Sequence, residues 1–324
     1  MKLALVTGGA GAVGSNLVRA LLADGQSVTV IDDLSSGRQA NLPDSPHLRF
    51  IHGSVLDEAV LRVAFDRRYD AVFHLAALFA NQNSVEHPQQ DLLVNALGTL
   101  KILEHCRSAS ARRFLLASSS CVYGAASGAL PEDHPRHFRQ TPYAITKAMA
   151  EDYTHFFREY HGLSTVVLRY FNVYGPGELP GPYRNVIPNF IARALQKLPL
   201  IITGDGTETR DFTFVADTVA GTIAAAETPA ACGLEINIGG GHDISIRTIA
   251  EQINALTANP AGIEFRERRA WDHVQRRCAV IDRARDILGY APKVTIEEGL
   301  RHTCEWLKKN AASAPPTPPS PSGN

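Results

Sequence analysis

Tyr143 and Lys147 are the two residues whose types and spacing first suggest chemistry. They lie four positions apart in 141–160, a segment with helical apolar spacing and Pro142 near its start, so both are expected on one helix face. A tyrosine is a poor base near neutral pH because its pKa is about 10, and a nearby ammonium group favours the phenolate. The pair therefore predicts a group that takes a proton from a substrate hydroxyl. The plainer interpretation is a surface pair, which has the same spacing.

Polar side chains follow the predicted strand 113–118. Ser118, Ser119, Ser120 and Cys121 stand at its carboxyl end, and ligands bind at that edge of open parallel sheets. Serine runs also form ordinary turns, but a site at this edge would bring these hydroxyls near Tyr143. We interpret Cys121 as a small buried filler rather than a reactive thiol.

A glycine turn links the predicted strand 2–6 to the predicted helix 15–23. Gly8 is expected to allow the tight turn, Gly11 to let the backbone approach a pyrophosphate, and Gly14 to let the helix pack close to the sheet. The first helical turn offers free N–H groups to phosphates. An ordinary tight turn is the alternative, but the complete strand, turn and helix favour a dinucleotide site.

Asp32 ends the next predicted strand, 27–31, and lies 18 positions after Gly14. That is close to the distance of about 20 expected for the acid that binds a ribose 2′-hydroxyl. A carboxylate there would repel a 2′-phosphate. The sequence therefore favours NAD over NADP as the cofactor.

Further strands and helices alternate along the chain. They predict a Rossmann-type α/β fold: a doubly wound parallel sheet with a smaller carboxyl-terminal α/β substrate-binding domain. Because 324 residues exceed the usual single-core limit of about 250–300, two domains are expected. We assign 1–172 to the NAD-binding domain, to which 211–239 returns, and 173–310 to the substrate domain. The last segment, 311–324, has five prolines and predicts a disordered tail. The remaining predicted strands are 48–52, 70–77, 165–170 and 234–238, and the remaining predicted helices are 91–108, 186–195, 215–227, 246–256 and 296–308. Residues 201–210 are interpreted as rich in turns.

Charge and cysteine content exclude several classes of function. Lys plus Arg number 32 and Asp plus Glu 33, a balance that favours neither a nucleic-acid nor a membrane-surface partner. No apolar run approaches about 18 residues, which argues against a membrane span or signal peptide. Five cysteines without a CxxC motif are typical of a reduced, cytoplasmic protein. No histidine pair has metal-ligand spacing, so no metal site is expected.

Taken together, these motifs resemble the extended short-chain dehydrogenase/reductase family, and within it the NAD-dependent enzymes that act on nucleotide sugars. The resemblance covers 1–310. It rests on Thr7-Gly8-x-x-Gly11-x-x-Gly14, Asp32-Asp33-Leu34-Ser35, His74-Leu75-Ala76-Ala77, Val94-Asn95, Ser118 to Gly124, Tyr143-x-x-x-Lys147, Arg169 to Pro176 and Arg210-Asp211-Phe212.

The resemblance implies roles for residues that spacing alone does not assign. Tyr143 would be the base, Lys147 would also hold the nicotinamide ribose, and Ser119 would hydrogen-bond the reacting oxygen. The implied cofactor contacts are Gly8, Gly11, Ala12, Val13, Gly14, Asp32, Asp33, Ser36, Gly37, Ser54, Val55, Leu75, Ala76, Ala77, Asn95, Ser118, Tyr143, Lys147 and Tyr170. The implied substrate contacts are Ser119, Ser120, Cys121, Tyr143, Asn172, Val186, Ile187, Arg210, Arg269 and Asp272.

The reaction type depends on positions 120 and 121. Dehydratases of the family carry adjacent Asp and Glu there, and decarboxylases usually keep the Glu, whereas this chain has Ser120 and Cys121. The resemblance then implies a 4-epimerase acting on a UDP-hexose or UDP-hexuronic acid. A dehydratase, a decarboxylase, a 4-ketoreductase and a non-catalytic NAD-binding regulator stay open as alternatives. UDP is taken from family frequency alone.

The chain departs from the family pattern at two places, and the family resemblance also implies an oligomeric state. Ser54 replaces an Asp that normally binds adenine, and Arg269-Ala270-Trp271-Asp272 replaces the usual Arg-Pro-Gly-Asp. Relatives commonly dimerise through two long helices. Here these would be 91–108 and 141–160, so a homodimer is expected.

Overall fold

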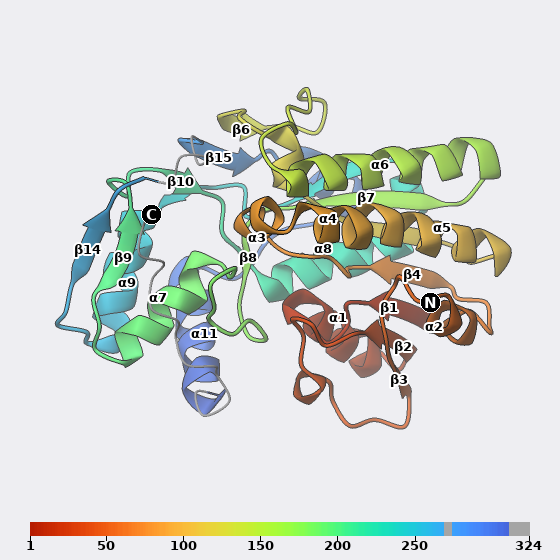
Figure 1. Ribbon diagram of the computed structural model, residues 1–324, viewed down its shortest axis with the longest axis horizontal. Helices are drawn as coiled ribbons and strands as arrows, with labels where there is room; N and C mark the ends of the chain where they lie inside the picture. Colours follow the sequence, from red (N-terminus) through yellow and green to blue (C-terminus); the bar gives the residue numbers. More distant parts are fainter. Residues whose placement is uncertain (269–273, 311–324) are drawn as a thin grey trace.

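A parallel sheet organises the chain, which the computed structural model describes over residues 1–268 and 274–310. Within these residues the main sheet has seven strands in the order β12-β7-β5-β4-β1-β2-β3 (Figure 1). The order reverses between β1 and β4, and a ligand crevice is expected at the carboxyl ends there. The strands are β1 (Leu3–Thr7), β2 (Ser27–Asp32), β3 (Leu48–His52), β4 (Ala71–His74), β5 (Phe114–Ser119), β7 (Thr165–Tyr170) and β12 (Glu235–Ile238). The predicted fold class is confirmed.

Helices cover both faces of this sheet because its strands are apolar on both sides. Val6 packs into one buried cluster with Leu17 of α1 and Val219 of α8. Leu5, the preceding residue, packs into a second cluster with Ile102 of α5 and Phe157 of α6. This alternation along a strand is the pattern of a doubly covered sheet. The helices are α1 (Ala12–Ala23) and α8 (Val215–Glu227) on the first side, and α2 (Glu58–Ala64), α5 (Gly98–Ser108) and α6 (Pro142–His161) on the second.

The connection between β4 and α5 differs from the prediction. The strand predicted over 70–77 ends at His74, and residues 75–80 are irregular. The helix predicted over 91–108 is interrupted in its first third. The helices of this stretch are α3 (Asn81–Glu86), α4 (Pro88–Asp91), a π-helical segment η2 (Leu92–Leu97) and α5. Tertiary hydrogen bonds, described below, hold the irregular segment in place.

A second lobe lies beyond the carboxyl ends of the main sheet (Figure 1). It contains a four-stranded sheet in the order β13-β10-β15-β6 and two strand pairs, β11-β8 and β14-β9. Its strands are β6 (Gly128–Leu130), β8 (Val173–Tyr174), β9 (Leu200–Thr203), β10 (Thr209–Arg210), β11 (Thr213–Phe214), β13 (Ile244–Ser245), β14 (Ile263–Arg266) and β15 (Arg276–Ala279). Its helices are α7 (Val186–Leu195), α9 (Ile246–Thr257) and α11 (Ile296–Asn310), whereas α10 (Asp282–Leu288) packs against β12 of the main sheet and against α8. Short 3-10 turns are η1 (Gln39–Asn41), η3 (Ser120–Tyr123) and η4 (Pro229–Ala231).

Long-range pairing explains where the sequence prediction was incomplete. The segment 201–210, interpreted as turns, contributes β9 and β10, because β9 pairs with β14 and β10 with β15. β12 pairs in parallel with β7 and so completes the main sheet from a later part of the chain. The division into two domains stays a prediction, and the proline-rich segment 311–324 lies outside the described residues. No helix in 1–268 or 274–310 is long and apolar enough to cross a membrane.

Candidate active site

The glycine turn between β1 and α1 packs tightly against the segment after β4. Gly8 has a φ of +69°, and a Cβ there would lie 2.7 Å from the backbone nitrogen of Ala76. A Cβ on Gly14 would lie 2.1 Å from the carbonyl oxygen of Gly8. Gly14 therefore lets the helix close onto the turn itself, rather than onto the sheet as predicted. Larger residues at these positions would push the turn open.

The amino end of α1 faces out of this turn without a side-chain cap. Gly11 is the N-cap, no side chain accepts a hydrogen bond from the first turn, and that turn has no acidic residue. First-turn N–H groups, here at Ala12 and Val13, have no partner inside an α-helix. The uncapped helix end fits a pyrophosphate group.

Asp32 is held beside the turn by two backbone donors. Its Oδ2 accepts a hydrogen bond from Ala10 N at 2.9 Å, and its Oδ1 accepts one from Leu34 N at 2.8 Å. Burial raises the pKa of this carboxyl group, while both backbone donors act in the opposite direction. Each oxygen keeps a lone pair with which it can accept a bond from a ribose hydroxyl.

The other predicted cofactor contacts surround Asp32. Asp33 is exposed and accepts hydrogen bonds from the backbone nitrogen and hydroxyl of Ser35. Arg184 donates to the carbonyl oxygen of Ser36 at 2.8 Å. A Cβ on Gly37 would lie 2.7 Å from the backbone of Ala10. The loop after β2 therefore sits close to the glycine turn.

Ser54 and Val55 follow β3. The Ser54 hydroxyl accepts a hydrogen bond from Leu56 N at 3.2 Å, so its own proton is available for an acceptor on a ligand. Val55 is buried and lies against Gly98 of α5. The structure thus places a hydroxyl where the resemblance led us to expect a carboxylate.

A chain of hydrogen bonds fixes the end of β4. Thr99 Oγ1 donates to the carbonyl oxygen of Asn95 at 2.6 Å, so it must accept the bond of 3.0 Å from His74 Nε2. His74 Nδ1 is then the acceptor of the Thr7 hydroxyl proton, at 2.7 Å. Burial lowers the pKa of His74 to about 3, which keeps the ring neutral. The hydroxyl of Thr7 in turn accepts a bond from Ala76 N at 3.2 Å.

Asn95 holds the irregular segment after β4 from the other side. Its Oδ1 accepts from Leu78 N at 2.8 Å, and its Nδ2 donates to Asp91 at 2.7 Å. Asp91 also accepts from the Thr146 hydroxyl at 2.7 Å, which ties the segment to α6. Leu75, Ala76 and Ala77 are thereby kept beside the glycine turn.

The structure brings Ser119, Tyr143 and Lys147 together. α6 begins after Thr141, whose hydroxyl accepts from Ala144 N, and this start places Tyr143 in the first turn. Ser119 lies beside Tyr143, close enough for its hydroxyl to act on the pKa of the phenol. Lys147 Nζ lies 5.8 Å from the centre of the Tyr143 ring and donates to the carbonyl oxygen of Ala117 at 2.9 Å. All three residues meet where β5 ends.

Burial dominates the electrostatics of this group. It raises the pKa of the Tyr143 phenol, and Cys121 and Asp91 act in the same direction, whereas the Ser119 hydroxyl opposes them. Burial also lowers the pKa of Lys147 to about 8, against the attraction of Asp91 and Glu151. In the protein without its cofactor, burial therefore outweighs the lowering of the Tyr143 pKa that we expected from Lys147.

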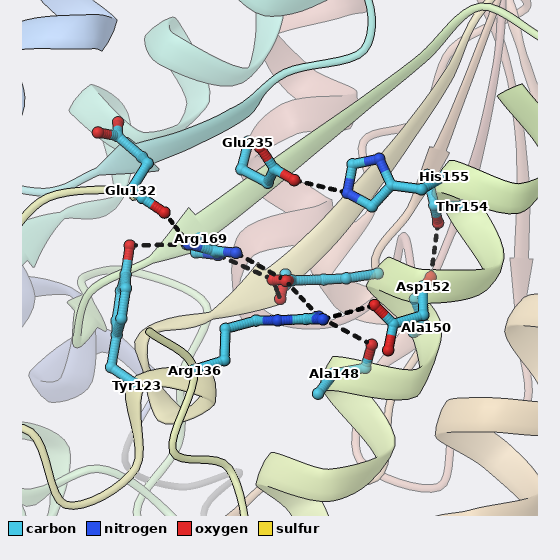
Figure 2. A network of polar contacts seen from close by, with 12 residues as sticks. Tyr123, Glu132, Arg136, Ala148, Ala150, Asp152, Thr154, His155, Arg169 and Glu235 are labelled. Carbon is cyan, nitrogen blue, oxygen red and sulfur yellow. Dashed lines mark hydrogen bonds and ion pairs between the residues drawn. The ribbon is translucent and has the colours of Figure 1, made fainter. Parts of the chain in front are cut away.

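A buried ionic network lies one turn further along α6. Arg169 donates through Nε and Nη2 to the two carboxylate oxygens of Glu151, at 3.0 and 2.9 Å. Figure 2 shows Arg169 beside Tyr123 and Glu132, whose hydroxyl and carbonyl oxygen accept from its Nη1 at 3.0 Å each. Glu151 also accepts from the Ser118 hydroxyl at 2.6 Å. The network fixes α6 against the end of β5, and it engages Ser118, which we expected to touch the cofactor.

The predicted substrate contacts are placed around the second lobe. Tyr170, a predicted cofactor contact, lies instead at the end of β7 in the main sheet, where its hydroxyl is hydrogen-bonded to Thr222 of α8 at 2.7 Å. Asn172 has a φ of +27° and donates to the carbonyl oxygen of Asp211 at 3.1 Å. Ile187 at the start of α7 is fully buried, so only its backbone is available there to a ligand. Arg210 lies on β10, Val186 begins α7 and Ser120 is buried in η3. The other two predicted contacts, Arg269 and Asp272, lie outside the described residues.

Cys121 is not the buried filler that we predicted. It is half-buried, and its Sγ lies 3.6 Å from Asn81 Nδ2 and 4.0 Å from Arg277 Nη1. Its backbone nitrogen donates to the Ser119 hydroxyl at 3.2 Å. The thiol therefore belongs to the wall of the site, because η3 turns it toward the second lobe.

Sequence reasoning missed several residues of this site. Asp91 and Thr146 carry hydrogen bonds that position the group, and Asp91 could have been found from its i,i+4 spacing to Asn95. Arg277 had no local signal, because its strand was not predicted. No group of three or more His, Cys, Asp or Glu side chains among the described residues is arranged to hold a metal ion.

A parallel sheet with an uncapped glycine turn and a Ser, Tyr and Lys group at its carboxyl edge defines a dinucleotide-dependent enzyme. A model of the NAD dependent epimerase/dehydratase family matches residues 4–239. The chain therefore belongs to that family, and NAD is its cofactor. The uncapped end of α1 and the second lone pair on each oxygen of Asp32 fit this cofactor.

Relatives cover almost the whole chain. A UDP-glucose 4-epimerase of Mycolicibacterium smegmatis is 35% identical over 95% of this chain and 99% of its own length. A UDP-N-acetyl-alpha-D-glucosaminuronate decarboxylase of Bacillus cytotoxicus is 33% identical over 95% of this chain and 98% of its own length. The structure of an epimerase from the methanogen Methanothermobacter thermautotrophicus has a TM-score of 0.94 and 47% identity, covering 96% of this chain and 94% of that one. These relatives are nucleotide-sugar enzymes or epimerases that differ in reaction.

Proposed function

We propose that the protein is an NAD-dependent 4-epimerase of a UDP-hexose or UDP-hexuronic acid. The observation that carries this proposal is the end of β5, where Ser119 meets Tyr143 and Lys147. The two residues that follow, Ser120 and Cys121, provide a hydroxyl and a thiol instead of carboxyl groups. Elimination and decarboxylation therefore lack the proton carriers of related enzymes, whereas hydride transfer at C4 has all its protein groups.

Each residue has a defined task in this reaction. Tyr143 takes the proton of the C4 hydroxyl, and Ser119 donates a hydrogen bond to the same sugar oxygen. NAD⁺, held by the glycine turn and Asp32, would supply the hydride acceptor and donor for C4 and a positive charge near the phenol. Once the 4-keto sugar has rotated, Tyr143 would give the proton back to the oxygen. Lys147, held by Ala117, keeps a cation beside the tyrosine throughout.

A deuterium label tests this reaction. With deuterium at C4 of the substrate, we expect the epimer to carry deuterium at C4, because the cofactor holds the label between the two transfers. NMR of the product measures the label and the configuration together. Deuterium from solvent at C5 or C6 would indicate an enolising mechanism instead, and a pentose product would indicate the decarboxylase that one relative represents.

Asp32 is expected to select the cofactor. Asp32→Ala removes the carboxylate that would bind the ribose 2′-hydroxyl and repel a 2′-phosphate, so NAD affinity should fall and discrimination against NADP should relax. Fluorescence titration with NAD⁺ and NADP⁺ measures both effects. Asp24→Ala, at the exposed C-cap of α1, is the matched control and should change neither. A wild-type preference for NADP would contradict this role.

An exposed apolar stripe supports a homodimer. It runs along the π-helical segment and α6, two elements that pack against each other. Its members, each at least 36% exposed, are Leu92, Leu93, Leu97, Ile145, Tyr153 and Phe156. Apolar patches of this kind on a soluble chain mark protein interfaces, and helices that pair this way bury such residues in a four-helix bundle.

Light scattering tests the dimer. The wild type should have twice the 35.1 kDa mass of one chain, and Leu93→Arg should shift it to the monomer because a charge would be buried in the bundle. Leu256→Arg on α9 replaces a leucine of similar exposure outside the stripe, so it should leave the dimer intact. A wild-type particle of one chain mass at micromolar concentration would exclude this assembly.

The cysteines suggest a compartment. All five, including the half-buried Cys121 and Cys232, are free thiols. Free thiols are typical of proteins in reducing compartments. We therefore place the reaction in the cytoplasm.

A further inference from the structure

Arg277 is a buried guanidinium group without a charged partner. It lies on β15 and is 7% exposed. Its Nη2 donates to the carbonyl oxygen of Gly124, its Nη1 lies 4.0 Å from Cys121 Sγ, and its buried Nε has no hydrogen-bond partner. No carboxylate of residues 1–268 or 274–310 forms an ion pair with it. The side chain thus keeps donors and a full charge unused.

The other arginines nearby are paired differently. Arg276, the preceding residue, is half-exposed and forms an ion pair with Asp243 at 2.9 Å. Arg169 is as deeply buried as Arg277, but Glu151 neutralises it through two hydrogen bonds. A guanidinium does not lose its proton in a protein, and an uncompensated buried charge costs several kcal/mol. Arg277 is therefore matched to an anion that residues 1–268 and 274–310 do not supply.

The position of Arg277 relates this anion to the active site. In the second-lobe sheet, Arg277 is paired in register with Arg210 on β10, which we expect to contact the diphosphate. Its other neighbour is β6, and its side chain reaches η3 at Cys121, whose backbone nitrogen donates to the hydroxyl of Ser119. Arg277 therefore lies between the expected diphosphate site and the group that acts on C4. The sugar of a nucleotide sugar must occupy this interval.

We propose that Arg277 binds a carboxylate on the sugar, so that the substrate is a UDP-hexuronic acid rather than a neutral UDP-hexose. This proposal rests on the proposed function and narrows it. A guanidinium forms strong charge-assisted hydrogen bonds with a carboxylate. The donor that is left for it is Nη1, whose single contact among the described residues is the distant Cys121 Sγ. In a pyranuronic acid the carboxylate is attached to C5, next to the C4 carbon on which Tyr143 acts.

The same contact protects the carboxylate during the reaction. A 4-keto hexuronic acid is a β-keto acid, which loses CO2 when the C5–C6 bond breaks and its electron pair moves to the C4 oxygen. An ion pair with Arg277 stabilises the carboxylate more than the departing neutral CO2. Such ground-state binding slows bond breaking. The wild type is thus expected to return the epimer with C6 retained.

Binding without turnover tests the proposal. In the NAD-loaded Tyr143→Phe protein, calorimetry compares UDP-glucuronic acid with UDP-glucose, and we expect a preference of about 10²-fold for the acid. Arg277→Met should remove that preference and leave UDP-glucose binding nearly unchanged, and Arg277→Lys should restore part of it. Arg276→Met is the matched control and should keep the full preference. Without sugar nucleotide, Arg277→Met should unfold at the same or a higher temperature, because it removes an unpaired buried charge.

Three results would overturn the proposal. The first is a wild-type preference for the neutral sugar nucleotide. The second is an equal loss of affinity for UDP-glucuronic acid and UDP-glucose in Arg277→Met. The third is a lower unfolding temperature of that variant, which would assign Arg277 a structural role. The test is independent of the reaction. If the carboxylate preference depends on Arg277 but the active enzyme forms a 4-keto product, the epimerase proposal fails and the Arg277 assignment stands. A pentose product would also contradict the protection of the carboxylate by Arg277 and leave only its role in binding.

Discussion

Tyr143→Phe should lower turnover by at least about 10²–10⁴-fold, the contribution of a positioned general base. The substitution removes only the hydroxyl. The ring keeps its edge-on contact with Phe79, and the backbone nitrogen of Tyr143 still donates to Ser84 Oγ. The fold and the NAD and sugar-nucleotide sites should therefore survive. Single-turnover kinetics together with binding titrations separate the lost proton transfer from any loss of affinity.

Tyr153→Phe provides the comparison on the same helix. Tyr153 lies on α6, is 36% exposed and takes no part in the contacts around Ser119. The Tyr153→Phe enzyme should therefore be as active as the wild type. A Tyr143→Phe enzyme that turns over within a few-fold of the wild type would require another base. A Tyr143→Phe enzyme that no longer binds NAD would show that the hydroxyl supports the site rather than the reaction.

Local signals were sufficient for the first half of the fold. The glycine turn, the helix after it and Asp32 each depend on residues close in sequence, and the structure has β1, α1 and β2 within two or three residues of the predicted ranges. α6 was predicted from its apolar spacing and Pro142, and its ends are set by the Thr141 cap and by Gly162 at φ +67°. Strand and helix propensities agree with the tertiary structure there.

The second lobe could not be predicted in the same way. β6 and β15 are short, and β15 begins with two arginines, so neither shows strand periodicity. They form because β15 pairs with both β10 and β6, strands far away in the sequence. Arg277 is buried only through this pairing. His74 illustrates the same limit, because its neutral form depends on burial in the folded protein, and its hydrogen-bond partners Thr7 and Thr99 lie on other elements.

Arg169→Met should cause the largest loss of stability among the substitutions considered. It leaves the carboxylate of Glu151, which has no exposed surface, with only Ser118 and the partly exposed Arg136 as side-chain partners. Removing one partner of a buried ion pair typically lowers the free energy of unfolding by about 3–5 kcal/mol, because the remaining charge is buried without compensation. Thermal and denaturant unfolding measure the loss.

Glu58→Gln is the surface control for this substitution. Glu58 binds Lys101 and His105 but is about half-exposed, so its loss should change the free energy of unfolding far less, because solvent screens exposed ion pairs. A double variant, Arg169→Met with Glu151→Leu, should recover much of the stability because it removes both charges together. If the single and the double variant were equally unstable, the loss would come from packing around Tyr123 instead of from the unpaired carboxylate.

Arg169→Met should also reduce turnover. Tyr143, Lys147 and Glu151 occur at every fourth position of α6 and so share one helix face, which this variant should shift.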